Sequence, residues 1–259
     1  VKPALGPKEP WAYRNKMQMP VGGTKGDIQM GFYAMGSHDI VQGTNCPIQD
    51  EGNNIIAQAC YQIAKEFDIE PYDEYTGKGV LRHIIGRIGQ SGWMIILVTA
   101  TEQLPYKEKW VEKLTERIPQ VETIVHNVNG KRTNVILGPK NNILYGEGTI
   151  TDHIKDLQFT LSPHSFFQVN PEQTTVLYDQ ALEYADLKGD ETVIDAYCGT
   201  GTISLFLAHK AKHVIGIEIV EPAIINAREN AKRNGYDNTE FIVADAAVEM
   251  PKLYKAGVR

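Results

Sequence analysis

The chain has 259 residues, of which 42% are hydrophobic and 22% charged, and its formal net charge is −6. This balance is typical of an ordinary globular protein, and the length is sufficient to bury a core. Apolar runs stay well below the roughly 18 residues of a membrane-spanning helix, so we expect no membrane partner. Cys46, Cys60 and Cys198 are too few and too far apart for a disulfide framework, which favours a reducing, cytoplasmic location.

Residues 1–160 are predicted to form an α+β domain. Alternating apolar and polar residues flank a glycine-rich turn at 21–26 and predict a β-hairpin there. The dipeptide Asn129-Gly130 is typical of tight turns and is expected to join two later strands. The predicted strands of this part are 14–19, 28–34, 80–88, 93–99, 121–127 and 133–137.

Two helices are predicted between these strands. Apolar residues recur at helical spacing over 53–67 and again over 107–117. Asn53 or Asn54 is the expected N-cap of the first helix, because a short polar side chain there accepts a hydrogen bond from a free backbone N–H.

Charge is distributed unevenly along the chain. The acidic excess lies mostly in 161–259, whereas 1–160 is nearly balanced and holds local basic clusters. These clusters are Lys8, Arg14, Lys16 and Lys25; Arg82, His83 and Arg87; and Lys131 and Arg132. One interpretation is a basic patch that binds nucleic acid. The other is a set of scattered, solvated charges, and charge alone leaves both open.

From about residue 166 the pattern changes to alternating helices and strands. Pro171 is expected at the first position of a helix that runs to about residue 185. Strands are predicted over 192–197, 213–218 and 240–245, with helices over 203–210 and 222–234 between them. The order β-α-β-α-β predicts a parallel, doubly wound sheet and therefore an α/β fold.

Ligand-binding residue types follow each of these strands. Gly199 and Gly201 follow the first strand, where glycine lets the backbone approach a ligand. Glu218 ends the second strand, where it can accept from ribose hydroxyls, and Asp245 ends the third, where it can accept from an adenine amino group. Together they predict a nucleotide-type cofactor, although each alone is weak evidence.

The residues around the glycines favour one cofactor. A dinucleotide fingerprint has a third glycine beside the pyrophosphate, and Ser204 stands there. Asp195 precedes the loop, and Asp-x-x-x-Gly-x-Gly suits S-adenosylmethionine, which has no pyrophosphate. A nicotinamide-dependent oxidoreductase is therefore disfavoured, and a methyltransferase with a Rossmann-like domain is favoured.

Several motifs resemble the RNA (uracil-5-)-methyltransferase family. The most specific is Ser165-Phe166-Phe167-Gln168-Val169-Asn170, followed by Asp195-Ala196-Tyr197-Cys198-Gly199-Thr200-Gly201 and Gly216-Ile217-Glu218. Earlier matching segments are Pro10–Lys16, Met30–Phe32, His38–Val41, Cys46–Ile48 and Leu81–His83. The branch most similar to this chain is the bacterial one that makes 5-methyluridine in 23S rRNA. The resemblance implies methylation of uridine C5 in RNA, with rRNA favoured as partner; tRNA methylation and a non-catalytic RNA-binding role are the alternatives.

The resemblance also implies roles for individual residues. Cofactor contacts are implied for Gln168, Tyr197, Glu218, Asp245, Thr202 and the backbone of Gly199 and Gly201. Phe166 would stack on the extruded uracil. From the residues themselves, Gln168 is also consistent with a buried amide bonded to backbone, and Phe166 and Tyr197 with ordinary core aromatics.

Cys46 matches the last of four family cysteines that bind a 4Fe-4S cluster. One cysteine cannot hold a cluster that takes four thiolates, so the cluster is expected only in a longer protein, and Cys46 is here an orphan ligand or a free thiol. Because the chain begins without Met, we expect it to derive from such a longer gene product.

The catalytic groups that the resemblance implies are expected beyond Arg259. In the family a cysteine thiolate adds to uracil C6, C5 then takes the methyl group, and a base removes the C5 proton. No residue of this chain matches the nucleophile, and the chain alone is expected to be inactive. Residues 161–259 would then be the N-terminal half of the methyltransferase domain. Strand 192–197 would be an exposed edge that the rest of the protein, a partner or a second copy covers.

Overall fold

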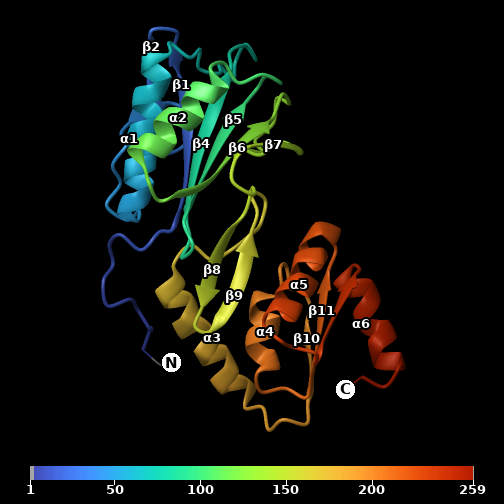
Figure 1. Ribbon diagram of the computed structural model, residues 1–259. Coiled ribbons are helices and arrows are strands. Elements are labelled where there is room, and N and C mark those ends of the chain that lie inside the picture. Colours follow the sequence, from blue (N-terminus) through green and yellow to red (C-terminus); the bar gives the residue numbers. More distant parts are fainter. Residues whose placement is uncertain (1–2, 259) are drawn as a thin grey trace. The chain divides into compact units, whose positions relative to one another are not determined.

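The computed structural model describes residues 3–258 (Figure 1). Contacts divide the chain into two compact units, which are described separately. The N-terminal unit comprises 8–151 and 162–164, and the C-terminal unit comprises the described residues up to Pro7, 152–161 and 165 onward. This division falls earlier than the expected boundary at residue 160, because β9 (Leu157–Leu161) packs against a helix of the C-terminal unit, α5 (Glu221–Arg233).

The N-terminal unit is built on a seven-stranded sheet with the order β3-β2-β1-β4-β5-β6-β7. Neighbouring strands are antiparallel except β5 and β6, which are parallel and are connected through a helix. The strands are β1 (Lys16–Thr24), β2 (Asp27–Tyr33), β3 (Ile40–Gln42), β4 (Leu81–Ile88), β5 (Trp93–Thr99), β6 (Val121–Val128) and β7 (Lys140–Tyr145). The predicted α+β character and the hairpin are confirmed, but β1 runs through most of the expected turn, since Gly22 and Gly23 pair with β2.

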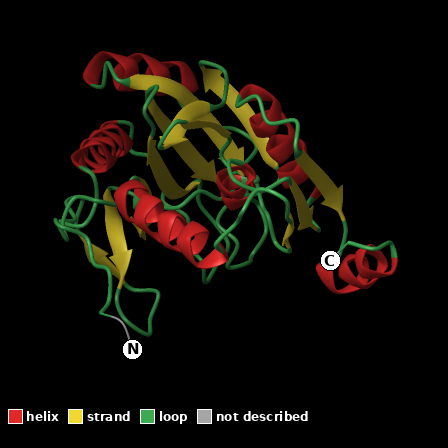
Figure 2. Ribbon diagram, turned by 90° about the horizontal axis from the view of Figure 1, so that it is seen from below, coloured by secondary structure: helices red, strands yellow, loops and turns green. Residues whose placement is uncertain are grey.

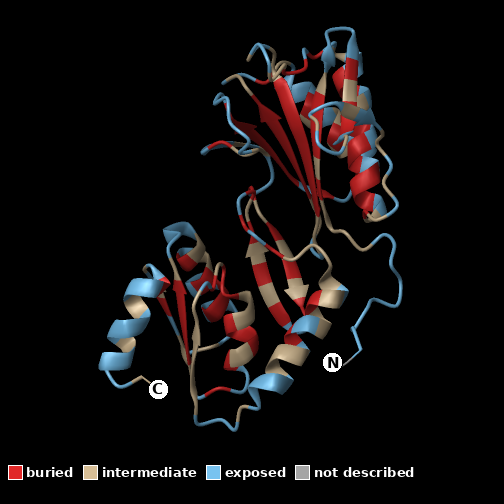
Figure 3. Ribbon diagram, turned by 180° about the vertical axis from the view of Figure 1, so that it is seen from behind, coloured by how far each residue is buried: buried red, intermediate tan, exposed pale blue. Residues whose placement is uncertain are grey.

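Two helices, α1 (Glu51–Glu66) and α2 (Lys107–Arg117), pack against this sheet (Figures 1 and 2). Their buried faces, with Ile56 on α1 and Trp110 on α2, form one apolar core with the strands. The central strands are buried along nearly their whole length (Figure 3). Asp50, which accepts from the Gly52 N–H at 2.8 Å, is the N-cap of α1.

The prediction that Asn53 or Asn54 is the N-cap is wrong, because both side chains form hydrogen bonds to segments outside the helix. The Asn53 side-chain amide donates to the Arg14 carbonyl at 3.1 Å. The Asn54 side-chain oxygen accepts from the Cys46 N–H at 3.0 Å. Both residues therefore lie inside α1 and tie neighbouring segments to it.

The predicted strand 133–137 is also wrong. The partner of β6 is β7, and 129–139 forms a loop. The Asn129 side chain donates to the carbonyls of Val135 (2.6 Å) and Ile136 (3.0 Å), so it organises this loop instead of starting a tight turn.

The C-terminal unit contains a parallel sheet, β10 (Thr192–Asp195), β11 (His213–Glu218) and β12 (Thr239–Val243), in that order. Helices α3 (Pro171–Ala185), α4 (Thr202–Ala208), α5 and α6 (Ala246–Lys255) accompany it. The two-stranded sheet of β8 (Ile150–Ile154) and β9 also lies here, apart from the first two residues of β8, which belong to the N-terminal unit. On β11, Val214 packs with Ala208 on one face of the sheet, and Ile215 packs with Ala246 on the other. Helices thus cover both faces, and the predicted doubly wound α/β fold is confirmed.

Within the described residues, β10 pairs only with β11, so it lies at an edge of this sheet. The strand ends at Asp195, two residues before its predicted end. The chain then turns, and the Cys198 N–H donates to the Ile217 carbonyl at 3.0 Å.

Helix α6 was not predicted. None of the helices described over residues 3–258 has the length and apolar character needed to cross a membrane.

Candidate cofactor site

The glycine loop between β10 and α4 contains two left-handed backbone positions. Gly199 has φ +54° and Gly201 has φ +81°, conformations that side chains with a Cβ rarely adopt. A Cβ on Gly201 would lie 3.1 Å from both Ala227 Cβ and Phe241 Cζ, whereas one on Gly199 would meet open space. Gly201 therefore serves the packing of α4, and Gly199 leaves the backbone open to a ligand.

Glu218, at the end of β11, is held against this loop. Its Oε2 accepts from the Gly199 N–H at 3.3 Å, and its Oε1 accepts from the Val220 N–H at 3.0 Å. Each carboxylate oxygen retains a lone pair after these bonds. The half-buried side chain is thus oriented and still able to accept from hydroxyl groups.

Asp195 forms a second carboxylate at the same edge of the sheet. Its Oδ2 accepts from Ser204 Oγ at 2.6 Å, and Ser204 is completely buried. Burial raises the pKa of the Asp195 carboxyl, the bond from Ser204 opposes that rise, and the charge of Glu218 adds to it. Ser204, where a dinucleotide site has glycine, is therefore a partner of Asp195.

Asp245 is the third carboxylate and the N-cap of α6. Its Oδ1 accepts from the Ala247 N–H at 2.8 Å, and the side chain is exposed. The Ala244 N–H donates to the Glu218 carbonyl at 3.0 Å, which joins the ends of β12 and β11. The structure thus brings Glu218 and Asp245 to the carboxyl ends of adjacent parallel strands, where open α/β sheets bind their ligands.

Tyr197 precedes the two loop glycines in the sequence, and Thr202 follows them as the first residue of α4. Thr202 Oγ1 is 3.0 Å from the Tyr178 hydroxyl of α3, a contact that the sequence did not reveal. Burial raises the pKa of Tyr178, so its hydroxyl stays protonated. Tyr197 is 81% exposed, which makes the interpretation of a strand-end core aromatic wrong.

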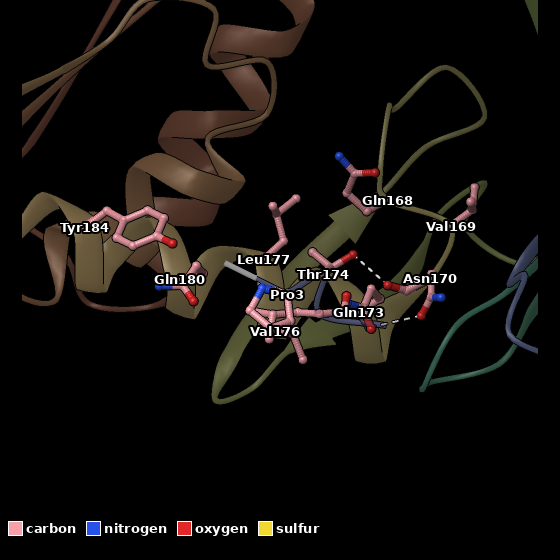
Figure 4. Close-up of a pocket in the computed structure, with 11 residues that line it drawn as sticks. Pro3, Gln168, Val169, Asn170, Gln173, Thr174, Val176, Leu177, Gln180 and Tyr184 are labelled. Atoms are coloured by element: carbon pink, nitrogen blue, oxygen red, sulfur yellow. Dashed lines mark hydrogen bonds between the residues drawn. The ribbon is translucent and has the colours of Figure 1, made fainter. Parts of the chain in front are cut away.

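The segment before α3 contains two further expected site residues. Phe166 is 74% exposed, while its neighbour Phe167 is buried with its ring centroid 5.6 Å from that of Phe159. Phe167 is therefore the residue that packs in the core, and the interpretation of Phe166 as a core aromatic is wrong. Gln168 is half-buried and lines a cavity of about 660 Å³ along α3, with Leu177 among its walls (Figure 4). The glycine loop does not line that cavity, so the two are separate features.

The three cysteines have different surroundings. Burial raises the pKa of the Cys60 thiol and raises that of Cys198 to about 12, so both are protonated at neutral pH. Cys46 is a half-buried free thiol. Over residues 3–258 no three His, Cys, Asp or Glu side chains are grouped to hold a metal, so the residues present do not complete an iron–sulfur site.

Comparison with known proteins agrees with this geometry. Residues 187–257 match the family model of a methyltransferase domain. The whole chain aligns, at 51% identity, with 57% of the length of a protein of Halalkalibacterium halodurans named as an uncharacterized RNA methyltransferase. It also aligns, at 49% identity, with 56% of the length of one from Clostridium acetobutylicum. The chain therefore spans a little over half the length of these curated relatives.

A solved structure extends the similarity to both units. The crystal structure of Pyrococcus abyssi tRNA (uracil-54, C5)-methyltransferase in complex with S-adenosyl-L-homocysteine matches with a TM-score of 0.76 and 25% identity, over 92% of this chain and 56% of that one. The C-terminal unit has the fold of an S-adenosylmethionine-dependent methyltransferase. The resemblance to the RNA (uracil-5-)-methyltransferase family, inferred above from the motifs, is supported by these matches.

Proposed function

We propose that the protein containing this chain transfers a methyl group from S-adenosylmethionine to C5 of a uridine in RNA. The observation that carries the proposal is the meeting of Glu218 with the Gly199 N–H, beside the strand end that holds Asp245. The RNA methyltransferases among the relatives and the uracil-C5 enzyme matched in structure support the same reaction.

The cofactor would supply an electrophilic methyl group on a sulfonium. Glu218 would accept from the ribose hydroxyls and Asp245 from the adenine amino group. The backbone at Gly199 and Gly201 would make room for the methionine part, with Thr202 beside it, and Gln168 and Tyr197 would add further contacts. The exposed ring of Phe166 would stack on the target uracil, because an unpaired base presents a free π-face.

None of the three cysteines suits the attack on uracil C6. The Cys60 and Cys198 thiols are buried and protonated, and Cys46 belongs to the N-terminal unit, whereas the glycine loop belongs to the C-terminal unit. The role we propose for residues 3–258 is therefore to bind the cofactor and the RNA. The N-terminal unit is proposed to contact the RNA.

We propose 23S rRNA as the substrate, on the likeness of the motifs to that branch; the tRNA enzyme matched in structure makes tRNA the second candidate. The deciding experiment is mass mapping of 5-methyluridine in rRNA and tRNA from a strain lacking the gene, with and without complementation. Loss of a methyl group from rRNA supports the proposal, and loss only from tRNA would show that tRNA is the substrate instead. An unchanged 5-methyluridine content in both overturns it.

A further inference from the structure

A small aromatic cavity lies in the N-terminal unit, outside the cofactor site. It measures about 220 Å³ and is lined by residues of β1 and β2, by 38–40 and by 72–75. Tyr33, His38, Tyr72 and Tyr75 supply four rings to its walls. Tyr75 is 82% exposed and Tyr33 38%, so stacking surface is open to solvent.

Glu74 connects two of these rings. Its Oε1 accepts from the Tyr33 hydroxyl at 3.0 Å, and its Oε2 lies 2.5 Å from His38 Nδ1. The rings of Tyr33 and His38 are stacked, with centroids 4.9 Å apart and planes inclined by 21°. Partial burial opposes ionisation of Glu74, but the bonds from His38 and Tyr33 outweigh it and lower its pKa. The carboxylate stays charged and keeps acceptor capacity toward the cavity.

Besides Glu74, the charged residues of the wall are Asp39 and Asp73, and Asp73 accepts within its own turn from the Tyr75 N–H at 2.8 Å and the Thr76 hydroxyl at 2.9 Å. Cationic side chains contact two of the wall tyrosines from outside the lining. The Arg82 guanidinium lies 4.4 Å from the centroid of the Tyr72 ring and donates to the Lys131 carbonyl at 2.8 Å. Arg132 donates to the Tyr75 carbonyl at 2.6 Å. These bonds fasten the loop that contains Lys131 and Arg132 beside the aromatic walls, so positive charge and stacking surface occur together. Single-stranded nucleic acids are bound by this combination.

We propose that this cavity is a stacking subsite for one unpaired RNA base, with preference for a base that has an amino group. The subsite rests on the proposed function, since it presumes an RNA substrate. The base would extend the Tyr33–His38 stack and donate its amino hydrogens to Glu74, while Lys131 and Arg132 meet the flanking phosphates.

An aromatic cage with a carboxylate would also suit a quaternary ammonium ion. Here the Tyr72 face is already covered by Arg82, and Arg132 reaches the carbonyls of Glu74 and Tyr75. The two arginines thus already occupy the Tyr72 face and the carbonyls beside Tyr75 that a further cation would use, which favours the base over an ammonium ligand.

Fluorescence anisotropy with labelled oligo(C), oligo(A) and oligo(U) octamers tests the subsite. Loss of one base–aromatic stack costs about 1–3 kcal/mol, so Tyr33→Ala is expected to weaken binding of oligo(C) by about 5- to 150-fold. Glu74→Gln is expected to remove the preference for oligo(C) over oligo(U). Tyr145→Ala is the matched control, because Tyr145 is an exposed tyrosine on β7, at the opposite edge of the same sheet from β3.

Wild-type affinity in Tyr33→Ala and in Tyr75→Ala, with unchanged thermal unfolding, overturns the subsite, as does no binding of any octamer by the wild type. Binding of tetramethylammonium by the wild type but not by Tyr33→Ala, with no displacement of the RNA from the wild type, also overturns it, in favour of a cation cage. The subsite and the proposed function fail separately. If 5-methyluridine is unchanged in the deletion strain but Tyr33→Ala binds RNA more weakly, only the function is rejected. If 5-methyluridine is lost in the deletion strain but Tyr33→Ala binds RNA as the wild type does, only the subsite is rejected.

Discussion

The Gly199 N–H donates to Glu218 Oε2 at 3.3 Å, which joins the loop after β10 to the end of β11. The two residues are far apart in sequence, and the parallel pairing of β10 with β11 brings them together. A carboxylate that already accepts from the backbone N–H groups of Gly199 and Val220 has little freedom to lose when a ligand binds. This pairing is the basis of the first two predictions.

Replacing Glu218 by Gln is expected to weaken S-adenosylmethionine binding. An amide oxygen can still accept from Gly199, so the fold should persist, but the charge-assisted bonds to ribose hydroxyls are lost. Such bonds contribute about 1.5–3 kcal/mol, which corresponds to a loss of roughly 10- to 150-fold in affinity by titration calorimetry. Glu221→Gln, at the exposed start of α5, is the control and should bind as the wild type does. Equal affinities for all three proteins would exclude Glu218 from the cofactor site.

The two loop glycines are expected to respond differently to alanine. Both have positive φ, which costs about 1–2 kcal/mol for a residue with a Cβ. Gly201→Ala adds the close approach to Ala227 and Phe241, so urea denaturation should show the larger loss of stability. Gly199→Ala should fold better and lose cofactor affinity, because its Cβ enters the space left for the ligand. The reverse order of the two stabilities would contradict this account of the loop.

Adjacent phenylalanines provide a matched pair. Phe167→Ala removes a buried ring and should lower the free energy of unfolding by about 3–5 kcal/mol. Phe166→Ala removes an exposed ring and should change it by less than about 0.5 kcal/mol, while reducing the proposed methylation of RNA by the full-length protein. Stability is measured by chemical denaturation and methyl transfer with radiolabelled S-adenosylmethionine. Full methylation by Phe166→Ala would remove this residue from the proposed uracil contact.

The lowered pKa of Lys16 predicts that the stability of the fold depends on pH. Burial, with the nearby charges of Arg87 and Arg14, lowers the pKa of Lys16 from 10.5 to about 8. The unfolded chain therefore binds the proton more tightly than the folded protein between pH 8 and 10.5, and the contribution of Lys16 to stability rises with pH across that window. Lys16→Met should remove this rise in denaturation curves measured from pH 7.5 to 10.5. An identical slope in wild type and variant would show that Lys16 titrates normally.

Local patterns were enough to predict much of this protein. Alternation at a period of two and apolar spacing near 3.6 depend on neighbours in the chain, so β4, β5, α2 and β11 lie within a residue of where they were expected. The order of strands and helices after residue 166, with its Gly-x-Gly turn, was enough for the parallel sheet and the methyltransferase fold, because a crossover helix allows few topologies.

Only the tertiary structure decided which side chains meet. Phe166 and Phe167 are adjacent residues of the same type, so the sequence does not distinguish them. Which of the two rings enters the core depends on the position of Phe159. The pairs Asp195–Ser204 and Thr202–Tyr178 join different elements. A sequence pattern records periodicity along one segment, whereas these contacts depend on how separate segments pack, and burial and hydrogen-bond partners follow from that packing.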